Sequence, residues 1–189
     1  IPSVRFGMQT NGTLLNNDFI DVFRKHGLNA GISLDGPKLI NDKNRIDHKS
    51  KGTYDRVIKA IELMQNNRDV WGGILCVLDI NTNPKDMIKY FHSLNPPSLD
   101  FLEPDGNWLK LPPGKPNHYT TEYGDWFIEA FNYWIDKHPK LKIRRFEEIL
   151  EHILGGSGST EYFGVEPANI ITIATDGSYE AVDQIKSAY

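Results

Sequence analysis

Polar side chains able to bind a ligand occur at four places in the first part of the chain, each just after a short apolar run. They are Gln9 and Asn11, then Ser33 and Asp35, then Asp79 and Asn81, and finally Glu103 and Asp105. Hydroxyl and amide groups donate and accept hydrogen bonds, and carboxylates act as acids, bases or acceptors. Such side chains form a binding site if the fold brings them to one edge.

The elements that must position these residues alternate between strand and helix. Apolar runs with strand-like composition cover residues 4–9, 28–33, 74–80 and 99–102. Between them, helices are predicted over residues 16–26, from the N-cap Thr53 to about Asn67, and from Asn83 with Pro84 in the first turn. Strands joined through right-handed helical crossovers make a parallel sheet, whose strands all end at one edge. Ligands of parallel sheets bind at that edge, which predicts a site there.

The two faces of the second predicted strand differ in character. Leu28, Ala30, Ile32 and Leu34 alternate with Asn29, Gly31, Ser33 and Asp35. Because successive strand residues point to opposite faces, one face is apolar and the other is small and polar. A fully packed barrel interior would carry branched apolar residues, so the polar face predicts room for a ligand.

The character of the sequence changes after residue 104. Residues 105–121 are rich in Pro, Gly and Asn and are expected to form a long loop that holds Trp108 and His118. Two helices are expected over residues 123–137 and 146–154, followed by a hairpin of residues 170–175 and 179–182. The second region is therefore expected to be mixed α+β, whereas the first is α/β.

Composition excludes several classes of protein. The 189 residues carry 21 Lys and Arg against 25 Asp and Glu, a formal net charge of -4, without a long basic run. We therefore expect no nucleic-acid partner. The longest apolar stretches, such as residues 74–78, fall far short of the ~20 residues that span a membrane, so we expect a cytoplasmic protein with no membrane partner. The single cysteine, Cys76, excludes an internal disulfide and any zinc or iron–sulfur site built from several cysteines of this chain.

Two motifs combine the polar residues with glycine. The first reads QTNGTLL over residues 9–15, and the second reads GISLDGP over residues 31–37, followed by Arg45 and by the triplet of residues 52–54, Gly-Thr-Tyr. Each motif alone is also typical of a turn, since Asn and Asp side chains bond to nearby backbone and glycine permits a tight bend. Together, in this order and at this spacing, they resemble the radical S-adenosylmethionine superfamily, in particular the sulfatase-maturase-like branch with SPASM extensions.

The resemblance covers residues 1–104 and implies a fold for them. That region would be the carboxyl-terminal half of a partial (β/α)6 barrel, with strands three to six and their helices. Residues 105–189 resemble the bridging region of peptide maturases that install cyclophane or similar crosslinks, and would lead to a SPASM domain. The stretches that carry this second likeness are residues 101–108, 123–126, 144–146, 155–156 with 159–161, and 175–178 with 182–183.

The resemblance also implies roles for individual residues. Ser33 and Arg45 match family residues that contact the ribose or carboxylate of S-adenosylmethionine, and Gln9 and Asn11 match residues near the cofactor. A guanidinium forms a two-pronged, charge-assisted pair with a carboxylate, which suits Arg45. The strand that contains Leu78 would offer backbone atoms to the adenine.

Three carboxylates are candidates for contact with the substrate. They are Asp35, Glu103 and Asp105, and Asp35 has the alternative of holding its own turn. In a different interpretation, Asp35 and Glu103 would be the paired carboxylates of a barrel hydrolase. That interpretation leaves Gln9 and Arg45 unexplained.

The chain departs from the superfamily in its metal ligands. The Cys-x3-Cys-x2-Cys motif, the Gly-Gly-Glu type of motif and the SPASM cysteines are all absent from the sequence. We therefore interpret the chain as a piece of a longer protein, in which the ligands of the [4Fe–4S] clusters lie outside residues 1–189. This piece alone is not expected to be active, because it cannot hold the reducing cluster.

The implied function is the modification of a ribosomally made peptide or protein side chain, by crosslinking or oxidation. It would proceed by hydrogen-atom abstraction with a 5′-deoxyadenosyl radical. The full-length protein would be an oxidoreductase with S-adenosylmethionine, [4Fe–4S] clusters, a peptide or protein substrate, and an electron donor of the flavodoxin or ferredoxin type. Two alternatives stay open: a sulfatase-maturating enzyme that makes formylglycine, and a cluster-free degenerate module that binds a peptide or nucleotide.

Overall fold

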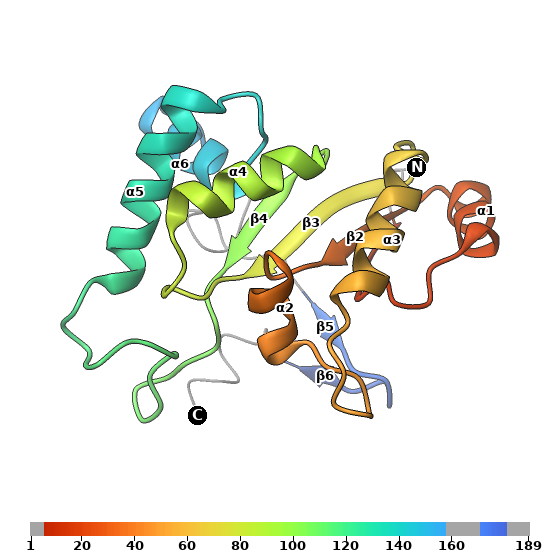
Figure 1. Ribbon diagram of the computed structural model, residues 1–189, viewed down its shortest axis with the longest axis horizontal. Helices are drawn as coiled ribbons and strands as arrows, with labels where there is room; N and C mark the ends of the chain where they lie inside the picture. The colour runs from red at the N-terminus through yellow and green to blue at the C-terminus, as the bar shows by residue number, and fades with distance from the viewer. Residues whose placement is uncertain (1–5, 158–170, 181–189) are drawn as a thin grey trace.

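A four-stranded parallel sheet forms the centre of the computed structural model, which describes residues 6–157 and 171–180 (Figure 1). The strands lie in the order β1-β2-β3-β4 and are β1 (Phe6–Thr10), β2 (Leu28–Ser33), β3 (Trp71–Val77) and β4 (Leu99–Leu102). Gln9 lies opposite Gly31, and Ser33 lies opposite Leu75. All four strands run in the same direction, so their carboxyl ends meet at one edge, as the sequence predicts.

Helices connect the strands and continue beyond the sheet. They are α1 (Asn17–His26), α2 (Lys38–Asn44), α3 (Tyr54–Gln65), α4 (Pro84–Leu94), α5 (Glu122–Lys137) and α6 (Arg144–Ile153). The predicted helices are confirmed, and the side chain of Asn83 accepts a hydrogen bond from the backbone of Asp86, as expected of an N-cap. The short helix α2 was not predicted, because its residues were interpreted as a polar loop.

The third strand is displaced from its predicted position. It begins at Trp71 rather than Ile74 and ends at Val77 rather than Ile80. The sequence gives no clear strand signal at residues 72–73, because glycine is unfavourable in a strand. In the structure Gly73 has φ 125, a conformation that favours glycine, and the pairing of β2 with β3 shifts register beside it.

The apolar face of the sheet forms the hydrophobic core. Ala30 and Ile32 of β2 and Ile74 and Cys76 of β3 are fully or almost fully buried. Figure 1 shows α3 and α4 passing in front of the sheet on this side. The opposite face carries the polar residues of β2, so the predicted difference between the two faces is confirmed.

The segment after β4 adds to the same body. Helix α5 packs along α4, and the segment just before α6 extends the sheet, where the backbone N–H of Leu99 donates to the carbonyl of Lys142 (2.8 Å). The ring of Phe101 in β4 packs against Trp126 of α5, with centroids 5.2 Å apart. The domain boundary expected between residues 104 and 105 stays a prediction.

Residues 171–180 form a short hairpin. β5 (Thr172–Ile173) pairs antiparallel with β6 (Tyr179–Glu180), as the sequence predicts, while residues 170 and 181–182 of the predicted hairpin lie outside the described residues. Among the helices of residues 6–157, none has the length and apolar character needed to cross a bilayer.

Candidate functional site at the carboxyl ends of the strands

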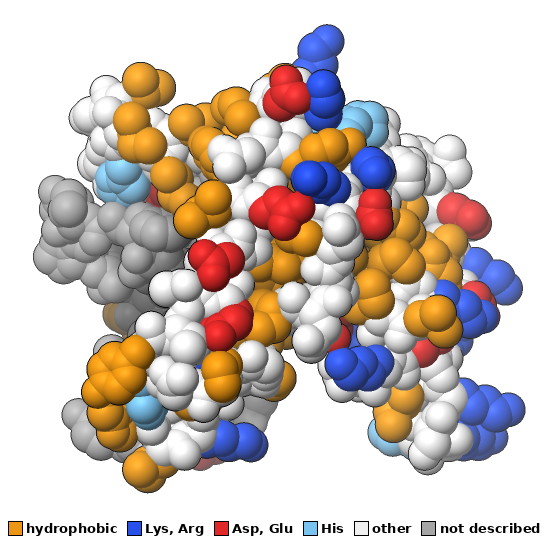
Figure 2. All heavy atoms as spheres, turned by 60° about the vertical axis from the view of Figure 1, so that its left-hand side comes forward, with side chains coloured by type: hydrophobic (Ala, Val, Ile, Leu, Met, Phe, Trp, Pro, Cys, Tyr) orange, Lys and Arg blue, Asp and Glu red, His pale blue; other side chains and the backbone are white. Residues whose placement is uncertain are grey.

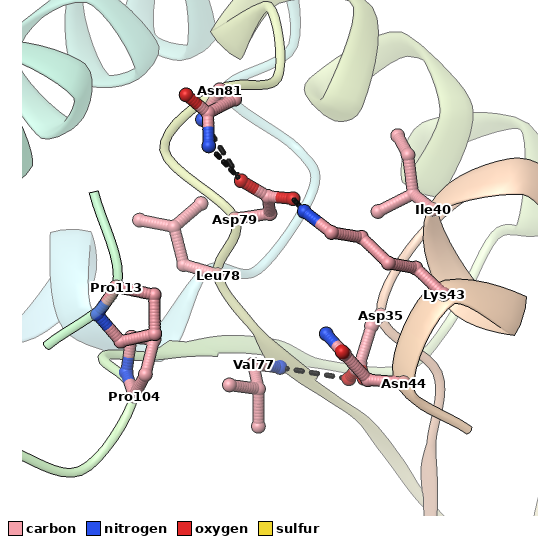
Figure 3. Close-up of a pocket in the computed structure, with 10 residues that line it drawn as sticks. All are labelled: Asp35, Ile40, Lys43, Asn44, Val77, Leu78, Asp79, Asn81, Pro104 and Pro113. Atoms are coloured by element: carbon pink, nitrogen blue, oxygen red, sulfur yellow. Dashed lines mark hydrogen bonds and ion pairs between the residues drawn. The ribbon is translucent and has the colours of Figure 1, made fainter. Parts of the chain in front are cut away.

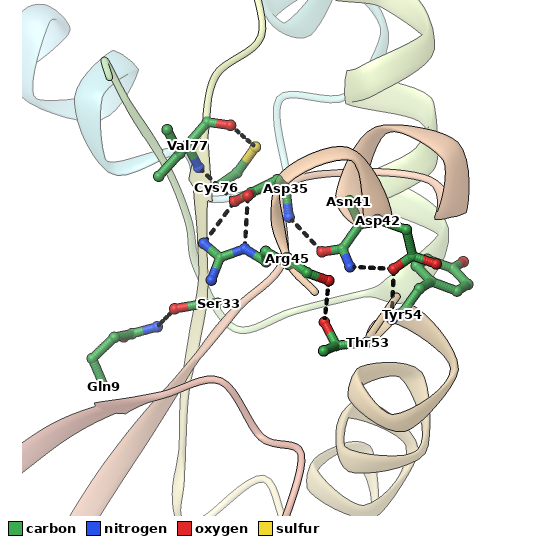
Figure 4. Close-up of polar contacts among 10 residues, drawn as sticks. All are labelled: Gln9, Ser33, Asp35, Asn41, Asp42, Arg45, Thr53, Tyr54, Cys76 and Val77. Atoms are coloured by element: carbon green, nitrogen blue, oxygen red, sulfur yellow. Dashed lines mark hydrogen bonds and ion pairs between the residues drawn. The ribbon is translucent and has the colours of Figure 1, made fainter. Parts of the chain in front are cut away.

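Gln9 and Ser33 meet on the polar face of the sheet, as the strand-end argument predicts. The side-chain amide of Gln9 donates a hydrogen bond to the hydroxyl of Ser33, at 3.0 Å (Figure 4). The Gln9 side chain crosses directly over Gly31, where any Cβ would collide with it. Glycine at residue 31 is therefore what allows the two polar groups to meet.

The side chain of Asn11 stabilises a turn of its own backbone. Its carbonyl oxygen accepts hydrogen bonds from the backbone N–H (3.1 Å) and the hydroxyl (3.0 Å) of Thr13, two residues on. This is an Asx turn at the carboxyl end of β1, with Asn11 exposed to solvent. The predicted cofactor role of Asn11 stays a prediction, since its side chain holds the turn and makes no bond to Gln9 or Ser33 in the described residues.

Arg45 and Asp35 form a two-pronged ion pair. Nε of Arg45 donates to one carboxylate oxygen of Asp35 at 2.7 Å, and Nη2 donates to the other at 2.8 Å. The backbone N–H of Val77 donates to the same carboxylate at 3.0 Å. The two side chains are only 24% and 11% exposed. Asp35 thus joins the loop after β2 to the end of β3.

A network within residues 35–54 holds this pair in place (Figure 4). Asn41 is fully buried, accepts a hydrogen bond from the backbone N–H of Asp35 (3.2 Å) and donates to Asp42 (3.0 Å). Thr53 donates through both its N–H and its hydroxyl to the carbonyl oxygen of Arg45, at 3.1 and 3.0 Å. The backbone position of Arg45 is therefore fixed independently of its side chain.

Thr53 is the N-cap residue of α3, as predicted, but its side chain makes no capping hydrogen bond. The Thr53 hydroxyl is committed to Arg45, and the carboxylate of Asp42 instead accepts from the backbone N–H of Tyr54, at 2.8 Å. A carboxylate at a helix N-terminus satisfies an orphan donor and complements the helix dipole. Residue 52 is glycine at a point where a Cβ would collide with the Asp42 side chain.

A pocket of about 180 Å³ adjoins the ion pair, between α2 and the segment that follows β3 (Figure 3). It is lined by Asp35, Ile40, Lys43, Asn44, Val77, Leu78, Asp79, Asn81, Pro104 and Pro113. Of the residues that the sequence places at the strand ends, Asp35, Leu78, Asp79 and Asn81 line it. Figure 2 shows a different view of the surface, hollowed at its lower edge between two lobes, with apolar and acidic side chains interspersed.

A second ion pair crosses this pocket. Nζ of Lys43 donates to the carboxylate of Asp79 at 2.7 Å, and Asn81 donates to the other oxygen through its backbone (3.0 Å) and its side chain (2.8 Å). Burial tends to raise the pKa of Asp79, but the hydrogen bonds from Lys43 and Asn81 outweigh it, so this pKa is lowered. Asp79 is therefore a charged acceptor at neutral pH.

Lys43 is a residue of this pocket that was not predicted, although the sequence carries a signal for it. Ile40, Lys43 and Asn44 line the same pocket and are spaced at i, i+3 and i+4, the spacing of one helical face. The signal is short, because α2 has 7 residues and its N-cap residue, Pro37, makes no side-chain cap. Recognising this helix would have placed all three side chains beside the strand ends.

Leu78 and the two later acidic candidates lie in different surroundings. Leu78 is buried, and its N–H donates to the carbonyl of Leu102 at 2.8 Å. Glu103 accepts a hydrogen bond from Nη1 of Arg145 at 2.8 Å, and Asp105 is exposed outside the pocket lining. The cofactor role of Leu78 and the substrate roles of Glu103 and Asp105 stay predictions.

The hydrolase alternative finds no support in this geometry. It requires Asp35 and Glu103 to act as a pair, whereas Asp35 is bound by Arg45 and Glu103 is bound by Arg145. Each carboxylate therefore has its own arginine partner.

Cys76 is unsuited to hold an iron–sulfur cluster. It lies fully buried on the apolar face of the sheet, and burial raises the pKa of its thiol well above the ordinary value. Cluster ligation requires an accessible thiolate. Over residues 6–157 and 171–180, no group of three or more His, Cys, Asp or Glu side chains is arranged to hold a metal ion.

Comparison with known proteins identifies relatives along the whole chain. The cysteine-type anaerobic sulfatase-maturating enzyme of Clostridium novyi (strain NT) is 29% identical over 199 residues, which cover 99% of this chain and 53% of the relative. The serine-type anaerobic sulfatase-maturating enzyme of Bacteroides thetaiotaomicron is 26% identical over 165 residues, covering 78% of this chain and 40% of the relative. No protein-family model matches the chain.

Solved structures agree with these sequence relatives. The structure described as native anSMEcpe with bound AdoMet and Kp18Cys peptide is similar to this chain with a TM-score of 0.72 and 28% identity. The match covers 82% of this chain and 44% of that one, so the chain spans about half the length of the proteins it matches. The cyclophane-forming branch is not among these matches. The homologues of this chain are therefore anaerobic sulfatase-maturating enzymes, which confirms the resemblance to radical S-adenosylmethionine maturases at that level.

Proposed function

We propose that this chain is the part of a radical S-adenosylmethionine maturase that binds the cofactor at the carboxyl ends of β1, β2 and β3. The whole protein would modify a peptide or protein side chain. The observation that carries the proposal is the convergence of Gln9, Ser33 and the Asp35–Arg45 pair on that edge, beside the pocket between α2 and β3. The bound AdoMet and peptide of the similar structure support both ligand classes.

The residues present suit S-adenosylmethionine. Ser33 accepts its hydrogen bond from Gln9, so its own hydroxyl proton is available to a ribose or carboxylate oxygen. The bonds of Arg45 to Asp35 use Nε and Nη2 and leave Nη1 for a ligand carboxylate. The pocket wall contributed by Ile40 and Leu78 offers apolar surface to a base or side chain.

The chain does not supply the metal cluster that such an enzyme needs. Its one cysteine is buried, so cluster ligands are proposed to lie outside residues 1–189, together with the SPASM region. When bound, S-adenosylmethionine supplies the group that removes a hydrogen atom from the substrate, after electron delivery by a donor of the flavodoxin or ferredoxin type. The residues of this chain orient the cofactor and border the space where a substrate enters.

Two alternative modifications of the substrate are proposed. Crosslinking of a ribosomally made peptide follows from the likeness of the bridging region to peptide maturases. Oxidation of Cys or Ser to formylglycine follows equally from the sulfatase-maturating relatives, which include both cysteine and serine types. A hydrazide label separates the two, because formylglycine carries an aldehyde that reacts with it and a crosslink does not.

A cluster-free binding module is the second candidate, and the single buried cysteine favours it. Such a module would bind S-adenosylmethionine or a peptide without producing 5′-deoxyadenosine. A titration with S-adenosylmethionine and an assay of 5′-deoxyadenosine release distinguish the two functions: binding with product release supports the maturase, and binding without it supports the module.

The experiment uses the full-length protein that contains this chain, under anaerobic conditions with dithionite and S-adenosylmethionine. Release of 5′-deoxyadenosine and the affinity for S-adenosylmethionine, measured by titration, are compared between Ser33→Ala and the matched control Ser93→Ala. Ser93 is an exposed residue of α4 whose hydroxyl donates to the carbonyl of Tyr90. We expect Ser33→Ala to weaken cofactor affinity about 2- to 12-fold, since one neutral hydrogen bond contributes about 0.5–1.5 kcal/mol. Equal affinity in the two variants would remove Ser33 from the cofactor site.

A further inference from the structure

We infer that Asp35 is a positioning residue for Arg45, which fixes the direction of its guanidinium and cancels its charge so that the site accepts a sulfonium cation. This inference rests on the proposed function, in which Arg45 faces S-adenosylmethionine. It replaces the substrate contact that the sequence predicts for Asp35.

The carboxylate of Asp35 is held from several sides. One oxygen accepts from both Nη2 of Arg45 (2.8 Å) and the backbone N–H of Val77 (3.0 Å), and the other accepts from Nε (2.7 Å). The backbone N–H of Asp35 is bound in turn by the fully buried Asn41. Because β3 and the buried amide both hold Asp35, it is a fixed reference point for any group that binds to it.

A fixed carboxylate determines where the guanidinium points. The guanidinium is planar, so two parallel bonds through Nε and Nη2 leave it no freedom to rotate. Its backbone is fixed separately, by the two bonds from Thr53. The remaining nitrogen, Nη1, therefore has one direction, and ordering it costs a ligand little conformational entropy.

The charge of the pair matters because S-adenosylmethionine carries a positive sulfonium as well as a carboxylate. An unpaired guanidinium in a half-buried site would repel that cation, since charges interact strongly where water is partly excluded. With Asp35 in place, Arg45 contributes a directed N–H and no net charge. S-adenosylhomocysteine has a neutral thioether at the same position, so the ratio of the two affinities measures this effect.

The test compares Asp35→Asn and Asp35→Glu in the full-length protein. Calorimetric titration with S-adenosylmethionine and S-adenosylhomocysteine gives the affinity ratio, and the Nε–H resonance of Arg45 in the NMR spectrum reports whether its guanidinium is held. Asp69→Asn is the matched control, because Asp69 makes a similar two-pronged pair with Arg24 on the exposed end of α1 (2.7 and 3.1 Å). Thermal unfolding confirms that each variant folds.

We expect Asp35→Asn to weaken S-adenosylmethionine binding about tenfold and S-adenosylhomocysteine binding about threefold, with loss of the slowly exchanging Nε–H signal. Asp35→Glu, which keeps the charge, restores the affinity ratio, and Asp69→Asn changes neither ligand. An unchanged Nε–H signal together with equal losses for the two ligands would overturn the inference. If the wild-type protein binds neither ligand, the proposed function fails, and the Nε–H signal still decides whether Asp35 fixes Arg45.

Discussion

Two arginine–aspartate pairs lie at different strands of the parallel sheet, Asp35 just after β2 and Asp100 within β4, and they differ in what they hold. In the first, Arg45 grips both oxygens of Asp35, and Val77 of the neighbouring strand adds a third bond. In the second, both donors of Arg144 converge on a single oxygen of Asp100 in β4, with Nε at 2.9 Å. The first pair borders a pocket, whereas the second joins the start of α6 to the sheet edge.

The difference shows how one kind of residue pair serves two purposes. The side chain of Arg45 is 24% exposed, and its Nε and Nη2 are both bound to Asp35. The side chain of Arg144 is 54% exposed and bonds only one carboxylate oxygen of Asp100. A pair that orients a ligand group needs two directed bonds on rigid supports, and a pair that attaches a helix needs only proximity.

The largest effect is expected in the aromatic cluster beside the second pair. Phe146 is 1% exposed and packs against Phe131 and Trp134, with ring centroids 5.3 Å away in each case. Phe146→Ala should lower the free energy of unfolding by about 3–5 kcal/mol, because a large buried side chain is lost and a cavity remains. Urea denaturation measures this, with the half-exposed Phe19→Ala as control. A loss below about 1 kcal/mol would show that α6 is loosely attached.

An intermediate effect on the free energy of unfolding is expected at Asn41, which supports the Asp35–Arg45 pair. Asn41→Ala removes the acceptor of the Asp35 N–H and the donor to Asp42, both at a fully buried position. Unsatisfied buried groups cost about 1–3 kcal/mol, so the free energy of unfolding should fall by that amount. The amide of Asp35 should also exchange faster with solvent in hydrogen-exchange measurements.

The control for this variant is Asn66→Ala. Asn66 bonds the carbonyl of Glu62 within an exposed helix end, so its loss should have little effect. Equal destabilisation by the two variants would contradict the claim that the loop of residues 35–54 depends on Asn41.

The smallest effect is a pH dependence with opposite sign at two carboxylates. Burial raises the pKa of Asp100 despite Arg144, so its contribution to stability falls as pH rises from about 4 through that raised pKa. The pKa of Asp79 is lowered, so its contribution is present above about pH 4 and is lost as pH falls below it. Urea denaturation of Asp100→Asn and Asp79→Asn across this range should therefore give slopes of opposite sign relative to wild type. Parallel slopes would contradict the assignment.

The sequence predicts the elements well where periodicity is strong. The alternation in β2 placed Ser33 and Asp35 on the polar face, and the parallel topology brought Gln9 to Ser33, because the strand ends must meet. The start of β3 was misplaced because residues 72–73 are glycines, which give no strand signal in the sequence. In the structure, glycine is needed there because the backbone of Ala30 and Gly31 lies close to Gly72, and Ser98 lies close to Gly73.

The arrangement around Arg45 could not be read from spacing. Its partner Asp35 is ten residues earlier, and the path between them is set by α2, a helix too short to give a clear period. The capping bond from the backbone N–H of Tyr54 to Asp42 was missed for the same reason, since Asp42 lies 12 residues before Tyr54 and only the folded loop brings it to the start of α3. Local pattern predicts strands and long helices, whereas polar networks depend on tertiary geometry.

The most direct test of this account is a titration of the full-length protein with S-adenosylmethionine in two variants. Arg45→Ala should weaken binding about 10- to 150-fold, equivalent to the about 1.5–3 kcal/mol of a hydrogen bond to a charged group. Arg144→Ala should lower stability and leave the affinity unchanged. Wild-type affinity in Arg45→Ala, or equal losses in both variants, would contradict the assignment of the cofactor site to the carboxyl ends of β1, β2 and β3.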